Sequence, residues 1–158
     1  MNNPKVNVGT NRFGKCLIAN SDIAKGEVVA VFDGPIYEAE KCTDLPVDIR
    51  DHAIQFEEHK WRDSNSMARY INHSCEPNCG IKGLFTLVTI KDVKKGDELL
   101  WDYAMTEDGD WRMECLCNTA SCRKIIGAFS LIPESLRPQY KEYASDWLVE
   151  KYKLNQTI

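Results

Sequence analysis

Three cysteines near residue 120 have a spacing that suits metal binding. Cys115, Cys117 and Cys122 are separated by one and by four residues, as thiolate ligands of zinc often are. The chain holds seven cysteines, an odd number that cannot all pair within one chain. The competing interpretation is that three small buried residues cluster without a metal. Because a structural zinc site takes four ligands, we expect a fourth ligand from elsewhere in the chain.

Three segments before these cysteines carry residues that can hold a polar ligand. They are Gly-Lys-Cys-Leu-Ile-Ala at 14–19, Arg-Tyr-Ile-Asn-His-Ser-Cys-Glu-Pro-Asn at 69–78 and Asp-Glu-Leu-Leu-Trp-Asp-Tyr at 97–103. Asn72 offers donors and an acceptor, and His73 can pair through its ring and its backbone. The competing interpretation is that both only satisfy buried backbone groups. Asn-His-Ser-Cys alone is weak evidence, so the order of the segments carries the argument.

That order resembles the SET domain family of protein lysine methyltransferases. Four elements follow one another over about residues 10–130: a Gly-x-Gly-like turn, Asn-His-Ser-Cys-x-Pro-Asn, Glu-Leu-x-aromatic-Asp-Tyr and the three cysteines. The resemblance implies a mainly β fold of the β-clip type, with small curved sheets, a few short helices and a C-terminal helix. It also implies a pseudoknot, in which the Asn-His segment passes beneath a loop around the Asp-Tyr motif.

The resemblance further implies an activity and a division of the chain. Family members transfer a methyl group from S-adenosylmethionine to the ε-amine of a protein lysine. The cofactor binds on one face, and the lysine enters a narrow channel from the other. The SET domain would span residues 1–106, the post-SET zinc segment residues 107–130, and a C-terminal helical extension, packed on the same domain, residues 131–158. We therefore expect S-adenosylmethionine and zinc as cofactors.

The same resemblance assigns the site residues. The catalytic residues would be Tyr103, Asn72 and His73. Asn72 and His73 would hold the purine and the methionyl ammonium, and Arg69 would steady the pocket or the carboxylate. The full set expected to bind the cofactor is Gly14, Lys15, Cys16, Arg69, Asn72, His73 and Tyr103. Without a Cβ, Gly14 would let main-chain groups approach that ligand closely.

Tyr103 is the residue expected to contribute most to catalysis. The reaction is an in-line displacement at a sulfonium methyl, so alignment supplies much of the rate. The nucleophile is a neutral amine, and neutralising a lysine of pKa about 10.4 at pH about 7.4 costs on the order of 4 kcal/mol. Desolvation beside a positive sulfonium lowers that cost. The hydroxyl of Tyr103 would orient the amine rather than act as a general base, because a phenol stays mostly protonated at neutral pH.

A narrow substrate channel is expected around Trp101, Tyr70 and Phe32. Trp101 stands where the family carries an aromatic residue that helps to set the methyl number: Phe goes with two or three methyl groups and Tyr with one. Trp leaves the number open, and its lack of a hydroxyl to hold water favours more than one. Cys16 replaces the second glycine of Gly-x-Gly, and Phe32 replaces a common tyrosine. These departures support an alternative, a catalytically silent SET module that binds zinc and a peptide or protein partner.

The fourth zinc ligand has two candidates near the Asn-His segment. In family members with a post-SET cluster, the cysteine of Asn-His-Ser-Cys completes the site, which implies Cys75. Cys79 is close enough in the sequence to compete, although Cys75 is preferred. Cys16 and Cys42 are expected to be ordinary thiols. A thiol redox function is disfavoured because no Cys-x-x-Cys pair opens a helix. The zinc ligands implied by the resemblance are Cys75, Cys115, Cys117 and Cys122.

The elements that must position these residues are mainly strands. Branched and aromatic residues separated by turn residues predict strands within 16–37 and 84–101. Towards the C-terminus, Tyr140, Tyr143, Ala144, Trp147 and Leu148 fall on one face of a helix. Pro at position 138 suits the first turn of that helix. We expect the helix to dock on the β core.

Composition narrows the partners. With 158 residues, 43% of them hydrophobic and 28% charged, the chain is typical of one globular domain. Its 20 Lys plus Arg against 24 Asp plus Glu give a net charge of −4, which disfavours direct nucleic-acid binding and favours a basic, lysine-containing protein such as a histone. No stretch is long and apolar enough for a membrane span or a signal peptide. We therefore expect no membrane partner and a soluble, intracellular protein, with nucleus and cytoplasm not distinguished.

Overall fold

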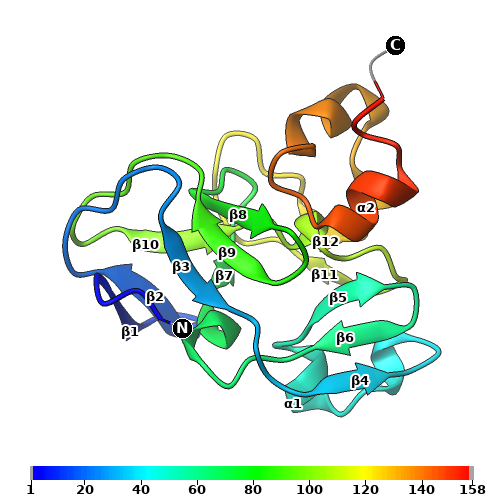
Figure 1. The fold of residues 1–158 in the computed structure, drawn as a ribbon, viewed down its shortest axis with the longest axis horizontal. Coiled ribbons are helices and arrows are strands. Elements are labelled where there is room, and N and C mark those ends of the chain that lie inside the picture. The colour runs from blue at the N-terminus through cyan, green and yellow to red at the C-terminus, as the bar shows by residue number, and fades with distance from the viewer. Residues whose placement is uncertain (1, 157–158) are drawn as a thin grey trace.

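Twelve strands form three sheets in residues 2–156, the part of the chain that this computed structural model describes (Figure 1). The strands are β1 (Val6–Asn11), β2 (Gly14–Ala19), β3 (Val28–Val31), β4 (Ile36–Glu38), β5 (Ile54–Glu57), β6 (Lys60–Arg62), β7 (Asn72–His73), β8 (Cys79–Lys82), β9 (Thr86–Thr89), β10 (Glu98–Trp101), β11 (Arg112–Glu114) and β12 (Ile125–Gly127). The α-helices are α1 (Val47–Arg50) and α2 (Asp146–Lys151). Five 3-10 helices join them: η1 (Cys42–Asp44), η2 (Met67–Tyr70), η3 (Tyr103–Met105), η4 (Phe129–Leu131) and η5 (Glu134–Tyr140). The expectation of a mainly β fold with few helices is confirmed.

The largest sheet brings distant motifs together. Its strand order is β1-β2-β10-β8-β9-β3, and β7 pairs with β10 off this path. The β7 and β10 strands run parallel, with Asn72 opposite Leu100 and His73 opposite Trp101. The side chain of Asn78 strengthens this junction, because it accepts from Leu100 N at 2.8 Å and donates to Glu98 O at 2.9 Å. The Asn-His and Asp-Tyr motifs, which the resemblance places side by side, therefore do pair.

The hydrophobic core fills the inside of this curved sheet. Branched and aromatic side chains supply most of it, as their preference for half-buried pleated strands leads one to expect. Leu17 of β2, Ile81 of β8 and Leu99 of β10 are fully buried there. Phe32, just after β3, packs against Trp101 with the ring centroids 6.0 Å apart. The core thus ends directly beneath the motif that carries Tyr103.

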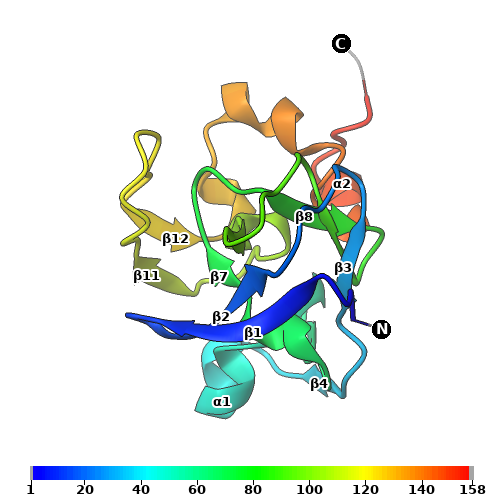
Figure 2. The same cartoon turned by 90° about the vertical axis from the view of Figure 1, so that its left-hand side faces the viewer.

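The two smaller sheets flank this core. Strands β4, β6 and β5 form one of them, beside α1, with its own buried cluster around Trp61. The other is the hairpin β11–β12, in which Met113 pairs with Ile126. At the left of Figure 2 this hairpin lies well away from α2. Its connecting loop contains the three clustered cysteines.

The C-terminal segment packs on the β core in a different form from the single helix expected. η5 ends at Tyr140, a turn follows, and α2 begins only at Asp146. Main-chain groups in the turn bond to the core instead of to a continuing helix: Ile81 N donates to Tyr143 O at 2.9 Å, and Ser145 N donates to Met105 O at 2.7 Å. A Cβ on Gly80 would lie 2.6 Å from Tyr143 Cβ, so this close approach depends on glycine. The expected helix is therefore reduced to α2.

Among residues 2–156, no helix combines the length and the apolar character that crossing a bilayer requires.

Candidate active site

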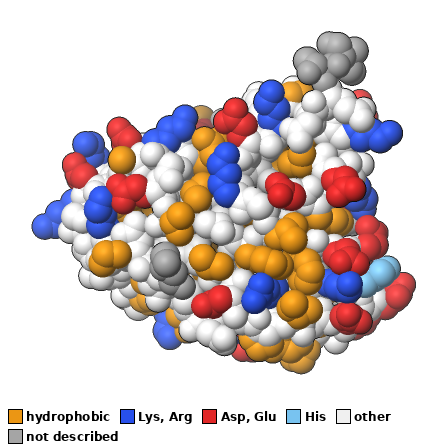
Figure 3. Space-filling view, viewed as in Figure 1, with side chains coloured by type: hydrophobic (Ala, Val, Ile, Leu, Met, Phe, Trp, Pro, Cys, Tyr) orange, Lys and Arg blue, Asp and Glu red, His pale blue; other side chains and the backbone are white. Residues whose placement is uncertain are grey.

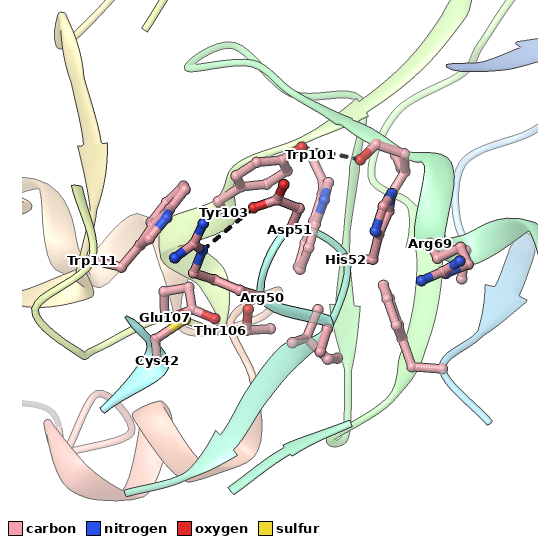
Figure 4. A pocket seen from close by; sticks show the side chains of 15 residues that line it. Cys42, Arg50, Asp51, His52, Arg69, Trp101, Tyr103, Thr106, Glu107 and Trp111 are labelled. Carbon is pink, nitrogen blue, oxygen red and sulfur yellow. Dashed lines mark hydrogen bonds and ion pairs between the residues drawn. The ribbon is translucent and has the colours of Figure 1, made fainter. Parts of the chain in front are cut away.

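Two hollows meet at Tyr103, the first residue of η3. The wide hollow, about 330 Å³, opens towards the β11–β12 hairpin. Its lining comprises Phe13, Asn72, His73, Tyr103, Met113, Glu114, Cys115, Leu116, Cys117 and Ile126. The narrow hollow, about 50 Å³, is also lined by Tyr103; in Figure 4 Trp111 lies at one end of its lining, Arg69 at the other and Trp101 between them. Tyr103 lines both hollows, so a group held in each would meet at this side chain.

Aromatic rings and one hydrogen bond fix the position of Tyr103. Its ring centroid lies 5.1 Å from that of His73, 5.7 Å from that of Trp101 and 6.3 Å from that of Trp111. The hydroxyl donates to Ile71 O at 3.3 Å. Burial raises the pKa of this hydroxyl above its ordinary value. Tyr103 therefore stays protonated at neutral pH and can orient a ligand, but it cannot serve as a base.

His73 is a neutral connector between Tyr103 and the cysteines. Tyr103 N donates to His73 Nδ1 at 3.1 Å, which assigns the ring proton to Nε2. Nε2 lies 3.3 Å from Cys75 Sγ. Burial lowers the pKa of His73 to about 4, so the ring is uncharged near pH 7. Both ring nitrogens of His73 therefore contact other groups of the protein. A ligand can contact His73 only through the face of its ring and through its backbone.

The predicted cofactor residues are only partly gathered around the wide hollow. Asn72, His73 and Tyr103 line it, whereas Gly14, Lys15 and Cys16 do not. The segment 14–16 remains adjacent, because Asn72 Nδ2 donates to Lys15 O at 3.3 Å. The φ of +113° at Gly14 lies in a region that favours glycine, so the turn itself requires this residue. The side chain of Cys16 is fully buried, which keeps this departure from Gly-x-Gly out of the hollow.

Arg69 is not brought to the wide hollow. Its Nη2 donates to Asp48 Oδ2 at 3.0 Å and to Asp63 Oδ2 at 3.1 Å. These ion pairs hold the guanidinium at the far end of the narrow hollow in Figure 4. A contact between Arg69 and the cofactor carboxylate would require breaking both pairs.

The predicted channel residues also separate. Phe32 and Trp101 both line the narrow hollow. Tyr70, the last residue of η2, does not: it lines an open surface groove, with Lys15 Nζ 4.5 Å from its ring centroid. Trp101 lacks a hydroxyl, but its indole ring carries another hydrogen-bond donor. Its indole Nε1 is buried without a hydrogen-bond partner in the described residues, so it can donate to a water in the hollow.

Several lining residues were missed by sequence reasoning. Phe13, Met113 and Leu116 ring the wide hollow although each is roughly half exposed. Trp111 lines the narrow hollow beside Tyr103. Each is a large apolar residue close to one of the motifs, and this was the only sign in the sequence that it could line the site. The sequence does not show which apolar residues remain exposed after folding.

The four cysteines form a site that fits zinc. The Sγ atoms of Cys75, Cys115, Cys117 and Cys122 all lie within 4.8 Å of one another, and those of Cys75 and Cys115 are 3.7 Å apart. A tetrahedral ion with Zn–S bonds of about 2.3 Å separates its sulfurs by about 3.8 Å. Backbone N–H groups support the thiolates: Arg123 N donates to Cys75 Sγ and Lys124 N to Cys122 Sγ, each at 3.4 Å.

Cys79 does not compete for this site. It is fully buried on β8, opposite Thr89 of β9, and it is not among the four clustered sulfurs. The preference for Cys75 as the fourth ligand therefore agrees with the geometry.

Glu107 is a buried carboxyl beside the narrow hollow that the sequence did not single out. Its Oε1 accepts from Gln55 N at 3.2 Å, whereas Oε2, near Trp61, makes no well-formed hydrogen bond within the described residues. Burial raises its pKa from an ordinary value of 4.5 to about 7. In the folded chain, Glu107 therefore stays largely protonated below neutral pH.

Glu107→Gln is expected to remove part of the pH dependence of stability. The folded-state pKa lies above the unfolded value, so the folded chain keeps a proton that the unfolded chain has lost. The free energy of unfolding consequently falls as the pH rises from 4.5 to about 7. The fall amounts to roughly 3 kcal/mol. Urea unfolding at about pH 5 and about pH 8 measures it. If the free energy of unfolding depends on pH equally in wild type and in Glu107→Gln, Glu107 does not retain its proton in the folded chain.

Comparisons with known proteins agree on one family. A family profile described as SET domain matches residues 14–104. A human protein named histone-lysine N-methyltransferase, H3 lysine-36 specific, is 27% identical over 159 residues, covering 89% of this chain and 6% of that protein. A Caenorhabditis elegans protein named probable histone-lysine N-methyltransferase set-23 is 36% identical over 73 residues, covering 39% of this chain and 29% of that protein. The chain thus spans less than a third of either relative.

A solved structure shares the fold. The chain described as KRYPTONITE in complex with mCHH DNA, H3(1-15) peptide and SAH matches with a TM-score of 0.58 at 22% identity, over 77% of this chain and 29% of that chain. The strands that pair Asn72 and His73 with β10 thus belong to a known type of β fold.

Proposed function

The chain belongs to the SET domain family, and we propose that it transfers a methyl group from S-adenosylmethionine to the ε-amine of a lysine in a basic protein or peptide, such as a histone tail. Family membership rests on residues 14–104, more than half of the 158 residues. The activity is carried by one observation: two hollows of unequal size meet at the side chain of Tyr103.

The unequal hollows suit the two reactants. The wide hollow has the size of a small-molecule site and opens beside the half-exposed apolar residues Phe13 and Leu116. The narrow hollow has room for little more than an unbranched chain, and Phe32, Ile54 and Trp101 give it apolar walls. A lysine side chain placed there is desolvated, which favours the neutral amine.

The reaction then needs alignment more than acid–base chemistry. The lone pair of the lysine nitrogen forms the new N–C bond as the C–S bond of the sulfonium breaks, and S-adenosylhomocysteine leaves. The proton of the lysine ammonium goes to water before the transfer. The Tyr103 hydroxyl, held at the junction by Ile71 O, is placed to orient the amine. Asn72 and His73 are proposed to hold the cofactor from the wide-hollow side.

Charge supports a basic partner. The chain carries a net charge of −4, and acidic side chains gather at the right-hand edge of Figure 3, over the sheet β4-β6-β5. Glu57, the last residue of β5, and Glu58 have more than half of their side chains exposed, and each is paired with a lysine, Lys60 and Lys151 respectively. Two relatives are named as histone-lysine N-methyltransferases, whose substrates are basic. A histone tail is therefore the first substrate to test.

The cysteine cluster is proposed to hold one structural zinc ion. Cys75 and the three cysteines of the hairpin loop would supply four thiolates, and the ion would pin β11–β12 beside the wide hollow. Reduced thiols of this kind suit an intracellular protein, which we propose as the localisation. We also propose the division into a SET domain at 1–106, a zinc segment at 107–130 and a C-terminal extension at 131–158.

Methyl transfer from labelled S-adenosylmethionine tests the proposal. Core histones and a total lysate serve as parallel acceptors, and mass spectrometry locates and counts the methyl groups. We expect label on lysine, and the count shows whether Trp101 permits more than one methyl. Binding of S-adenosylhomocysteine, followed by calorimetry, is the control for a functional cofactor site. Cofactor binding without transfer to either acceptor would favour the silent module that binds a peptide or protein partner.

A further inference from the structure

A buried carboxylate connects the zinc loop to the residue at the junction of the two hollows. Asp102, directly before Tyr103, has no exposed surface. Arg123 forms a bidentate pair with this carboxylate: Nη1 donates to Oδ2 and Nη2 donates to Oδ1, each at 2.7 Å. Tyr140 adds a third bond, donating to Oδ2 at 2.9 Å. A two-pronged pair of this kind fixes direction as well as distance.

Arg123 also belongs to the cysteine cluster by sequence and by contact. It follows Cys122 directly, and its backbone N–H donates to Cys75 Sγ at 3.4 Å. The backbone of this residue is thus tied to a proposed zinc ligand while its side chain is tied to Asp102. Any displacement of the cysteine loop must pull on Asp102 through these bonds.

Asp102 in turn holds the start of η3. Its Oδ1 accepts from Ala104 N at 3.0 Å and so caps the turn that begins with Tyr103. Tyr103 N is held by His73 Nδ1, whose ring also contacts Cys75 through Nε2. Consecutive backbone amides at 103 and 104 are therefore anchored to side chains that contact the cluster or its neighbour Arg123.

We propose that Arg123 is a positioning residue for methyl transfer, which aligns Tyr103 through Asp102 and makes that alignment depend on the occupied cysteine cluster. The inference rests on the proposed function for its effect on turnover. The inference also states that the cysteine cluster is coupled to the amides of residues 103 and 104. That coupling can be measured whether or not the protein turns over. The experiment therefore measures both.

Arg123→Lys tests the geometry of the pair while keeping its charge. A lysine presents a point charge instead of a planar fork, so it cannot hold both carboxylate oxygens in one orientation. We expect zinc content and the Kd for S-adenosylhomocysteine to stay within about twofold of wild type, and kcat to fall about tenfold or more with little change in the peptide KM. Lys5→Ala, which breaks the remote ion pair with Glu27, is the matched control and should leave all four values unchanged.

A double variant separates alignment from stability. Arg123→Met alone leaves a buried carboxylate unpaired and can prevent folding, whereas Asp102→Asn with Arg123→Met removes both charges. We expect the double variant to fold and to remain poorly active. Recovery of wild-type kcat in the double variant would overturn the proposal, as would an Arg123→Lys protein with unchanged kcat. Loss of zinc in Arg123→Lys would also overturn it, because Arg123 would then only hold the metal loop.

Amide hydrogen exchange gives a readout that is independent of catalysis. In wild type, chelation of zinc is expected to speed exchange at the amides of Tyr103 and Ala104 at least tenfold. In Arg123→Lys these amides should already exchange fast and respond little to the chelator. If wild type transfers no methyl groups but shows this exchange pattern, the proposed function fails and the coupling stands. If chelation of zinc does not change the exchange rate of either amide in wild type, the proposed coupling is wrong.

Discussion

Tyr103→Phe is expected to lower kcat for methyl transfer by about a hundredfold while S-adenosylhomocysteine binds nearly as well as to wild type. The change removes the hydroxyl that stands at the junction of the two hollows and keeps the ring that packs between His73 and Trp101. The lost bond to Ile71 O costs about 1 kcal/mol of stability, which is too little to unfold a domain. Initial rates and calorimetry on the same preparation provide the comparison.

Tyr152→Phe is the matched control for this prediction. It removes a phenol hydroxyl that donates to Asp108 Oδ1 at 2.9 Å, and Tyr152 lines neither hollow. Its kcat should be that of wild type. Full activity in Tyr103→Phe would remove Tyr103 from its proposed role, and an equal loss in both variants would point to general destabilisation.

Cys122→Ser is expected to abolish stoichiometric zinc binding and to weaken the wide hollow. Three thiolates and a poorly ionised hydroxyl replace a four-thiolate set, and structural zinc sites bind with apparent free energies of about 10–16 kcal/mol in small peptides. Without the ion, the loop that carries Cys115 and Cys117 loses its metal link to Cys75, and both cysteines line the hollow. Metal analysis should give less than one zinc per chain, and the Kd for S-adenosylhomocysteine should rise about tenfold or more.

Cys79→Ala separates this effect from the loss of any cysteine. Cys79 lies in the main core, outside the cluster, so its replacement should lower stability modestly and leave one zinc per chain. Zinc retained by Cys122→Ser but lost by Cys79→Ala would show that the wrong ligand set had been chosen. A wild-type protein that binds no zinc when freshly reduced would overturn the metal assignment altogether.

The order of the motifs was sufficient to predict the family, the mainly β class and the gathering of Cys75 with the three later cysteines. The spacing of Cys115, Cys117 and Cys122 is visible in the sequence itself, whereas the fold class and the choice of Cys75 came from the family resemblance that the ordered motifs carry. The side chains of Asn72, His73 and Tyr103 face one hollow because β7 pairs in parallel with β10, and that pairing is what the resemblance implied.

Positions decided by partners far away in the sequence were not predictable in this way. Arg69 turns from the wide hollow because Asp48 and Asp63 attract it, and their proximity arises only when α1 and β6 dock. The C-terminal helix is broken because Ile81 and Met105 compete for the backbone of residues 143–145, although its apolar spacing is helical. Helical periodicity reports which side chains are buried, and it does not report which backbone bonds the tertiary structure will claim.

The central place of β10 in the main sheet has a consequence for folding kinetics. This strand pairs with β2, β7 and β8, yet it follows the end of β2 by about eighty residues. At ribosomal rates of about 5–20 residues per second, β2 waits roughly 4 to 16 seconds for its partner. The nascent chain carries that unpaired edge throughout the interval. Slow refolding, and a yield that improves when chaperones are abundant, are therefore expected of this topology.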